Sequence, residues 1–192
     1  MVKGWKEKRL GDIAEIQMCK RIFAWQTTTS GDIPFYKIGT FGKEPDSYIP
    51  STLYKEYRDK YSYPSKGDIL LSAAGTIGRI VIYDGRPSYF QDSNIVWLKI
   101  DKNEICNEYL YYYYQIIIWA SPEGSTISRL YNGIIRDTNI ILPLLAEQHA
   151  IATALSETDE LINSLEKLIA KKRAIKQGTM QELVRNILTK YL

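Results

Sequence analysis

The chain has little material for a metal-dependent or nucleophilic active site. It contains one histidine and two cysteines in 192 residues. Cys19 and Cys106 are far apart in the sequence, so they predict neither a disulfide framework nor a metal-binding knot. His149 has no serine or cysteine nucleophile in a recognisable setting, and a lone histidine on a helix surface is more often structural than catalytic. We therefore expect no bound metal and no catalytic residue.

Motifs for nucleotide and cofactor chemistry are also missing. The sequence has no Gly-x-Gly-x-x-Gly and no phosphate-binding P-loop. It has no Asn-Pro-Pro-Tyr-like segment of the kind that amino-methyltransferases use, and no Glu-x-Lys triplet of the commonest metal-dependent nucleases. These absences favour a protein that is not itself an enzyme and that carries no cofactor.

Long apolar runs are absent as well. Ile116–Ile118 is far shorter than the roughly 20 residues of a membrane span. The N-terminal residues lack the apolar core of a signal peptide, and the paucity of cysteine fits a reducing compartment. We expect a cytoplasmic protein without a membrane partner. The net charge of +3 is only mildly basic, so any nucleic-acid surface must be a local patch.

Tyrosine is the residue in excess, with 15 copies, five of them between Tyr109 and Tyr114. Such a cluster could stack the bases of a single strand. Successive tyrosines point all round a helix, however, so most of them cannot share one ligand. We favour packing in the core and at interfaces, where tyrosine supplies apolar area and a hydroxyl group.

The first three quarters of the chain predict short strands and turns. Segment 10–16 predicts a short helix or turn, 33–38 a strand ended by Gly39, and 66–72 a turn that leads into a buried strand. Residues 74–78 reverse the chain into a strand at 79–83, and a turn at Asp84-Gly85 follows. A strand at 94–100, a helix at 108–120 and a strand at 134–142 complete the order. We predict an α+β domain with a curved, mainly antiparallel sheet at residues 1–146, followed by a helical spacer and dimerisation region at 147–192.

The spacer reads as one long helix with a coiled-coil face. No proline interrupts it, and its apolar residues recur at spacings of three and four: Ile151, Leu155, Leu161, Ile162, Leu165, Leu168, Ile169 and Ile175. Acidic residues at 157–166 precede basic residues at 167–176. In an antiparallel pair that crosses at Leu165, acidic residues therefore meet basic ones. An amphipathic helix folded onto its own domain needs the same periodicity, but the charge reversal favours pairing with a second copy or a close equivalent.

Several separated segments resemble the specificity subunit of type I restriction–modification systems, in a half-length form with one target-recognition domain. The segments are Trp5 with Leu10–Ile13, then 33–39, 67–72, 75–78, 142–148 and 165–173. Where the family pattern has two prolines, this chain has Pro143 followed by Leu144. Full-length members carry two recognition domains and two helical regions that pair antiparallel.

The resemblance implies a homodimer that rebuilds the full subunit and reads a bipartite palindromic site in double-stranded DNA. It also implies a methyltransferase subunit, which would hold S-adenosylmethionine, and a restriction subunit bound through that methyltransferase. The competing interpretations are a solitary dimeric DNA-binding regulator, a coiled-coil scaffold and an enzyme with an unrecognised site.

DNA contacts are expected from polar and basic side chains in the loops, because lysine and arginine neutralise phosphates and the polar side chains reach base edges. For each residue taken individually, a solvated surface group is the favoured interpretation. The set gains support because its members cluster in Gly- and Ser-rich segments between strands, where recognition loops usually lie. The candidates are Lys20, Arg21, Thr27, Thr28, Thr29, Ser30, Lys43, Arg58, Lys60, Arg79, Ser128, Arg129 and Asn132.

Overall fold

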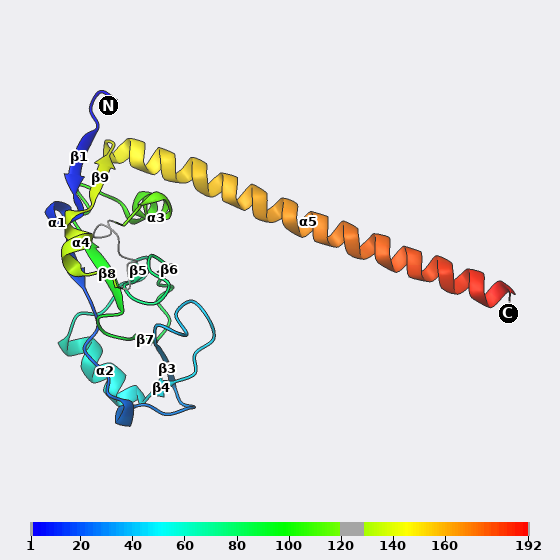
Figure 1. Ribbon diagram of the computed structural model, residues 1–192, viewed down its shortest axis with the longest axis horizontal. Coiled ribbons are helices and arrows are strands. Elements are labelled where there is room, and N and C mark those ends of the chain that lie inside the picture. The colour runs from blue at the N-terminus through cyan, green and yellow to red at the C-terminus, as the bar shows by residue number, and fades with distance from the viewer. Residues whose placement is uncertain (1, 120–128, 192) are drawn as a thin grey trace. The chain divides into compact units, whose positions relative to one another are not determined.

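The structure is a computed structural model that describes residues 2–119 and 129–191. It divides into two compact units, Met1–His149 and Ala150–Leu192. The first unit combines short strands with short helices, and the second is helical (Figure 1). The predicted α+β class with a long C-terminal helix is confirmed.

The main sheet of the first unit is antiparallel, in the order β2–β8–β5–β6. Its members are β2 (Ala14–Gln17), β8 (Ile95–Ile100), β5 (Ile69–Ser72) and β6 (Ile80–Ile82). The central strands β5 and β8 are continuous apolar runs with almost every side chain buried, as expected for strands covered on both faces. The predicted turn between β5 and β6 is present, and Gly75 and Gly78 adopt positive φ values of 64° and 81° there.

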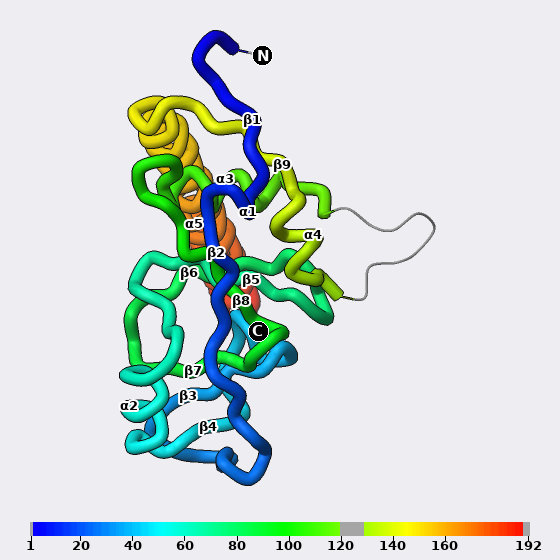
Figure 2. Tube along the Cα trace, turned by 90° about the vertical axis from the view of Figure 1, so that its left-hand side faces the viewer, coloured from blue at the N-terminus to red at the C-terminus, as the bar shows by residue number. Residues whose placement is uncertain are grey.

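A second, smaller sheet has the order β4–β3–β7. Strand β3 (Ile33–Tyr36) pairs antiparallel with β4 (Tyr48–Ile49) and parallel with β7 (Tyr89–Phe90). Helix α2 (Ser51–Lys60), which the sequence patterns do not predict, lies next to this sheet (Figures 1 and 2). One aromatic-rich core joins the two sheets, with Phe35, Tyr89 and Trp97 among its buried members.

The first strand and the last strand of the unit pair with each other. Strand β1 (Lys6–Arg9) runs antiparallel to β9 (Asn139–Leu142), and the two lie side by side in Figure 2. The single strand predicted at 134–142 is wrong in its first half, since residues Asn132–Asp137 form helix α4. This helix packs against α1 (Leu10–Ile13). The apolar residues of 134–142 are divided between two elements. Ile135 is buried in the core from helix α4, and Ile140 is buried from strand β9.

The tyrosine cluster lies on α3 (Asn107–Ile116), which is shorter than the helix predicted at 108–120. Tyr109 and Tyr114 are buried, and the Tyr109 hydroxyl donates a hydrogen bond of 2.7 Å to the carbonyl of Ile141. The Tyr113 hydroxyl accepts one of 3.2 Å from the Ile141 amide. The packing interpretation is confirmed for Tyr109, Tyr113 and Tyr114, the first two of which connect α3 to β9.

Gln148 fixes the start of the last helix within the first unit. Its side chain is fully buried, and Nε2 donates to the carbonyls of Glu104, at 2.8 Å, and Pro143, at 3.0 Å. Its Oε1 accepts a hydrogen bond of 3.1 Å from the amide of Cys106. One side chain therefore satisfies three backbone groups from two loops, which sets the position of residues 143–149 relative to α3.

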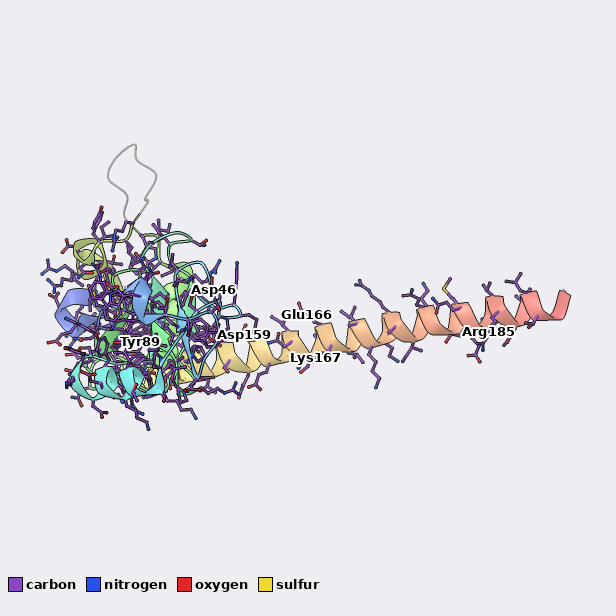
Figure 3. The ribbon with its side chains drawn as sticks, turned by 90° about the horizontal axis from the view of Figure 1, so that it is seen from below. Asp46, Tyr89, Asp159, Glu166, Lys167 and Arg185 are labelled. Atoms are coloured by element: carbon purple, nitrogen blue, oxygen red, sulfur yellow. The ribbon has the colours of Figure 1, made fainter. Side chains whose placement is uncertain are left out.

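Helix α5 (Leu145–Tyr191) has 47 residues, most of which form the second unit. At about 1.5 Å per residue it is about 70 Å long. From Leu155 to Leu188 its apolar side chains are exposed, and Glu166, Lys167 and Arg185 project from its surface (Figure 3). Within the described residues, no helix combines the length and apolar character that crossing a bilayer demands.

Candidate nucleic-acid interface

Two of the predicted arginines are anchored to one turn. Arg21 follows β2, and its Nε lies 2.9 Å from Oδ2 of Asp92 in an ion pair. Arg129 donates from Nη2 to the carbonyl of Ser93 at 3.0 Å. Ser93 has a positive φ of 59°, which is uncommon for a residue with a side chain. The Asp92–Ser93 turn thus brings together cations from segments 108 positions apart.

Arg79 and Lys43 belong to two loops that a hydrogen bond connects. Arg79 is half-buried, and its Nη1 donates to the carbonyl of Phe41 at 3.0 Å. Lys43 is exposed and lies two residues after Phe41 in the chain. Arg79 therefore holds the loop in place with part of its guanidinium group, while Lys43 leaves its ammonium group to solvent.

A second group of cations surrounds tyrosine rings at the end of α2. The Lys20 ammonium lies 5.1 Å from the centre of the Tyr61 ring, and the Arg58 guanidinium lies 5.9 Å from that of Tyr63. Lys60 forms an ion pair of 2.9 Å with Glu56 one turn earlier, and this hydrogen bond raises the pKa of the Lys60 ammonium. Cation–π contacts orient Lys20 and Arg58 without neutralising their charge. The Glu56 carboxylate does partly neutralise Lys60.

The hydroxyl-rich segment Thr27–Ser30 lies beside β4, where Thr28 bridges to Tyr48. Thr27 donates from its hydroxyl to Ala24, and Thr28 donates to Ser30. Thr29 and Ser30 are exposed, as is Asn132 at the start of α4. Ser128 lies outside the described residues.

An aromatic pair in this region was not predicted from the sequence. Trp25, in the short 3₁₀ helix η1 (Ala24–Gln26), has 80% of its surface exposed. Phe23 stacks on it with ring centres 6.3 Å apart and planes 7° from parallel. The signal in the sequence was a Phe-Ala-Trp segment between two cations and four hydroxyl residues. Exposed stacked rings offer a flat apolar face to a sugar or a base.

The candidates thus form a discontinuous set on several loops of the first unit. Lys20 and Arg21 are adjacent in the chain and connect the tyrosine-associated cations with those at the Asp92–Ser93 turn. Guanidinium and ammonium groups of this kind bind phosphate oxygens, and arginine also pairs with the guanine edge in the major groove. Neither cysteine adds chemistry to this surface. Both are buried, and burial raises the pKa of the Cys19 thiol to about 12.

Comparison with known proteins places this fold in one family. Residues 2–177 match the family described as type I restriction modification DNA specificity domain. The chain is 57% identical over 156 residues to a putative type I restriction enzyme specificity subunit of Haemophilus influenzae, covering 81% of this chain and 40% of the relative. A putative specificity subunit of the MjaX type I restriction enzyme from Methanocaldococcus jannaschii is 29% identical, over 93% of this chain and 45% of the relative.

Solved structures share the fold at low identity. The HsdS subunit of Thermoanaerobacter tengcongensis superposes with a TM-score of 0.63 at 20% identity, over 87% of this chain and 40% of that one. A second structure comes from a study of complex assembly and conformational transition in the type I restriction–modification system. It superposes with a TM-score of 0.67 at 21% identity, over 91% of this chain and 43% of that one. The chain thus spans less than half the length of the relatives it matches. It belongs to the type I restriction–modification DNA specificity family, as its separated motifs predict.

Proposed function

We propose that this chain is a DNA-reading specificity component that acts as a homodimer and recruits a methyltransferase subunit. The observation that carries the proposal is the combination of one domain of the DNA specificity family with a long helix that exposes a continuous apolar stripe. A restriction subunit would join through the methyltransferase. In this proposal the methyltransferase binds S-adenosylmethionine and transfers the methyl group, whereas this chain recognises the target DNA sequence.

The stripe on α5 supports pairing with an antiparallel copy. Leu155, Leu161, Ile162, Leu165, Leu168, Ile169 and Ile175 are exposed by 40–59% in the single chain, and Ile151 is half-buried. An exposed apolar surface of this length on a soluble domain marks an interaction site. About Leu165 as the crossing point, Leu155 faces Ile175 and Ile162 faces Leu168.

The charges on the helix distinguish between parallel and antiparallel pairing. Glu157 and Arg173 lie at equal distances on either side of Leu165, and so do Asp159 and Lys171. An antiparallel pair places these opposite charges together, whereas a parallel pair places each charge beside its own copy. Flanking charges of this kind set orientation in coiled coils. A second copy of this helix is therefore a complementary partner.

The DNA-contacting surface is proposed to include Lys20, Arg21 and Arg129, with the Phe23–Trp25 pair beside them. The side chain of Arg21 is 60% exposed, although Asp92 holds one of its nitrogens. An anchored arginine keeps its remaining N–H groups free and loses less side-chain entropy on binding. Phosphate contacts supply most non-specific affinity, so we expect binding to fall steeply with salt.

The length of α5 sets the shape of the target. From Glu147 to Leu165 are 18 residues, or about 27 Å, so the two helix entries lie about 54 Å apart in the pair. This corresponds to about 16 base pairs. Two-fold symmetry makes both domains read the same half-site in opposite orientation. The target is then an interrupted palindrome.

The test is co-expression of the chain with a methyltransferase encoded beside it, followed by sequencing of methylated bases. The proposal expects methylation at an interrupted palindrome, and none when either protein is omitted. Methyl transfer by the pure chain would contradict the assignment of chemistry to the partner. Tight, sequence-specific DNA binding by the chain alone, with no methylation when the methyltransferase is present, would instead indicate a solitary regulator.

A further inference from the structure

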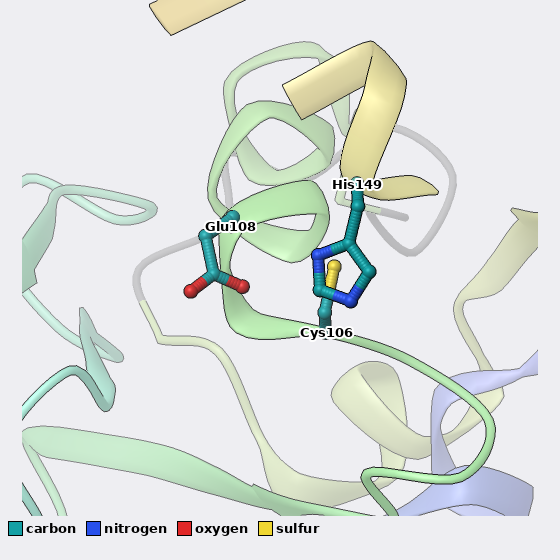
Figure 4. Close-up of side chains that lie close together, drawn as sticks. All are labelled: Cys106, Glu108 and His149. Carbon is teal, nitrogen blue, oxygen red and sulfur yellow. The ribbon is translucent and has the colours of Figure 1, made fainter. Parts of the chain in front are cut away.

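Three potential metal ligands converge where α3 and α5 begin. The Cys106 sulfur, a Glu108 carboxylate oxygen and a His149 ring nitrogen all lie within 4.8 Å of one another. In Figure 4 the Cys106 sulfur overlaps the His149 ring in projection, and the Glu108 carboxylate lies to one side of both. We propose that these residues form a binding site for a divalent cation of the zinc type. This proposal departs from the sequence-based expectation of no bound metal.

The ligand chemistry selects the kind of cation. Zn²⁺ binds thiolate sulfur, imidazole nitrogen and carboxylate oxygen, typically in a tetrahedron. Bond lengths of about 2.0–2.3 Å put such ligands about 3.5 Å apart. The present separation allows this to be reached by small side-chain rotations. A thiolate and a carboxylate together balance the two positive charges, and three protein ligands leave the fourth position to water or another ligand.

The frame that holds the ligands is rigid. Gln148, next to His149, accepts the amide hydrogen bond of Cys106 and donates to Glu104. Cys106 and Glu108 are the N-cap and second residue of α3, so their backbones are fixed by the same helix start. Because all three ligands belong to the compact unit Met1–His149, cation binding requires no rearrangement between units.

The surroundings leave the ligands available. Cys106 is 8% exposed, whereas Glu108 and His149 are on the surface, so the cation can enter from solvent. Within the described residues no lysine or arginine forms an ion pair with Glu108, and the nearby Lys8 pairs with Glu104 at 2.8 Å instead. On binding, the thiol transfers its proton to solvent as the sulfur–metal bond forms. The site would tie the first turn of α5 to α3.

Cobalt(II) titration of the full chain, prepared without a polyhistidine tag and stripped with chelator, tests the site. We expect thiolate-to-cobalt charge-transfer absorption that saturates at one ion per chain and disappears when Zn²⁺ is added. Cys106→Ser should abolish this absorption, and His149→Gln and Glu108→Gln should weaken cobalt binding at least tenfold. Cys19→Ala, which removes the other buried cysteine, is the matched control and should leave the titration unchanged.

A second measurement is independent of cobalt and of the stability of the cysteine variant. Since His149 is the only histidine, a nitrogen-15 spectrum of the ring reports one site, and one equivalent of Zn²⁺ should shift it. Zn²⁺ should also raise the melting temperature of the wild type but not of the His149→Gln variant, whose fold circular dichroism can check. A cobalt complex without thiolate absorption, or equal binding by wild type and the His149→Gln variant, would overturn the proposal.

Discussion

Replacing Leu165 with aspartate is the sharpest perturbation of the proposed helix pair. Leu165 is the predicted crossing point, so each copy of the residue would contact its own counterpart. It is 49% exposed in the single chain, and pairing would bury the remainder. Leu165→Asp removes this apolar contact twice and places two carboxylates side by side in the seam.

The expected loss is more than half of the binding free energy of a micromolar dimer, which is about 8 kcal/mol. Complete burial of a leucine contributes about 1.5–3 kcal/mol, so burying the exposed half contributes about 1 kcal/mol per copy. Two leucines therefore contribute about 2 kcal/mol. Desolvating two unpaired carboxylates adds a cost of several kcal/mol. A total of about 5 kcal/mol corresponds to more than a thousandfold weaker dimer, since 1.4 kcal/mol is a factor of ten.

Sedimentation velocity over a concentration series measures this effect. The wild type should sediment as a dimer and Leu165→Asp as a monomer with unchanged helix content. Asn163→Asp is the matched control, because it adds the same charge to the same helix away from the apolar stripe and should remain dimeric. A Leu165→Asp protein that stays dimeric would refute the antiparallel crossing at this residue.

Three further predictions concern the domain and its target. The double variant Lys20→Glu, Arg21→Glu should weaken DNA binding at least tenfold and flatten its salt dependence without unfolding the domain. Unchanged binding in a fluorescence-anisotropy titration would move the interface elsewhere. Gln148→Leu should lower the free energy of unfolding by about 3–5 kcal/mol, because three buried backbone groups lose their hydrogen-bond partner at a cost of about 1–3 kcal/mol each. A denaturation midpoint equal to that of the wild type would contradict this. Methylome sequencing should show inverted identical half-sites, and an asymmetric or continuous target would rule out the symmetric pair.

Strong local patterns made much of the fold predictable. Strands β5 and β8 are short apolar runs bounded by turn residues, and α5 has uninterrupted helical periodicity, so each stood out in the sequence. The family was recognisable because several motifs occur in the right order. Helix α2 was missed because its sequence is mostly polar and the helix buries only Tyr54 fully. The boundary between α4 and β9 was missed because both elements use one apolar run.

The arrangement of the site was less predictable, because it depends on contacts between distant segments. Loop composition identified Arg21 and Arg129 as candidates, but nothing local indicates that one turn anchors both. Likewise, Cys106 and His149 are 43 positions apart, and only the folded chain brings them together. The ion pair of Lys60 is instead a local contact that the sequence alone can indicate, since Glu56 lies four positions earlier on the same helix.

The pairing of β1 with β9 has a consequence for the order of folding during synthesis. Lys6 cannot form its ladder contacts until Leu142 has left the ribosome, so the domain closes only when nearly all of it has been made. Contacts over such a separation form slowly. Until then the first strand has an open edge, and its sequence Lys-Glu-Lys-Arg protects it, because charged edge strands resist pairing with other chains. A nascent chain arrested before residue 139 should remain soluble and susceptible to proteolysis at its N-terminus.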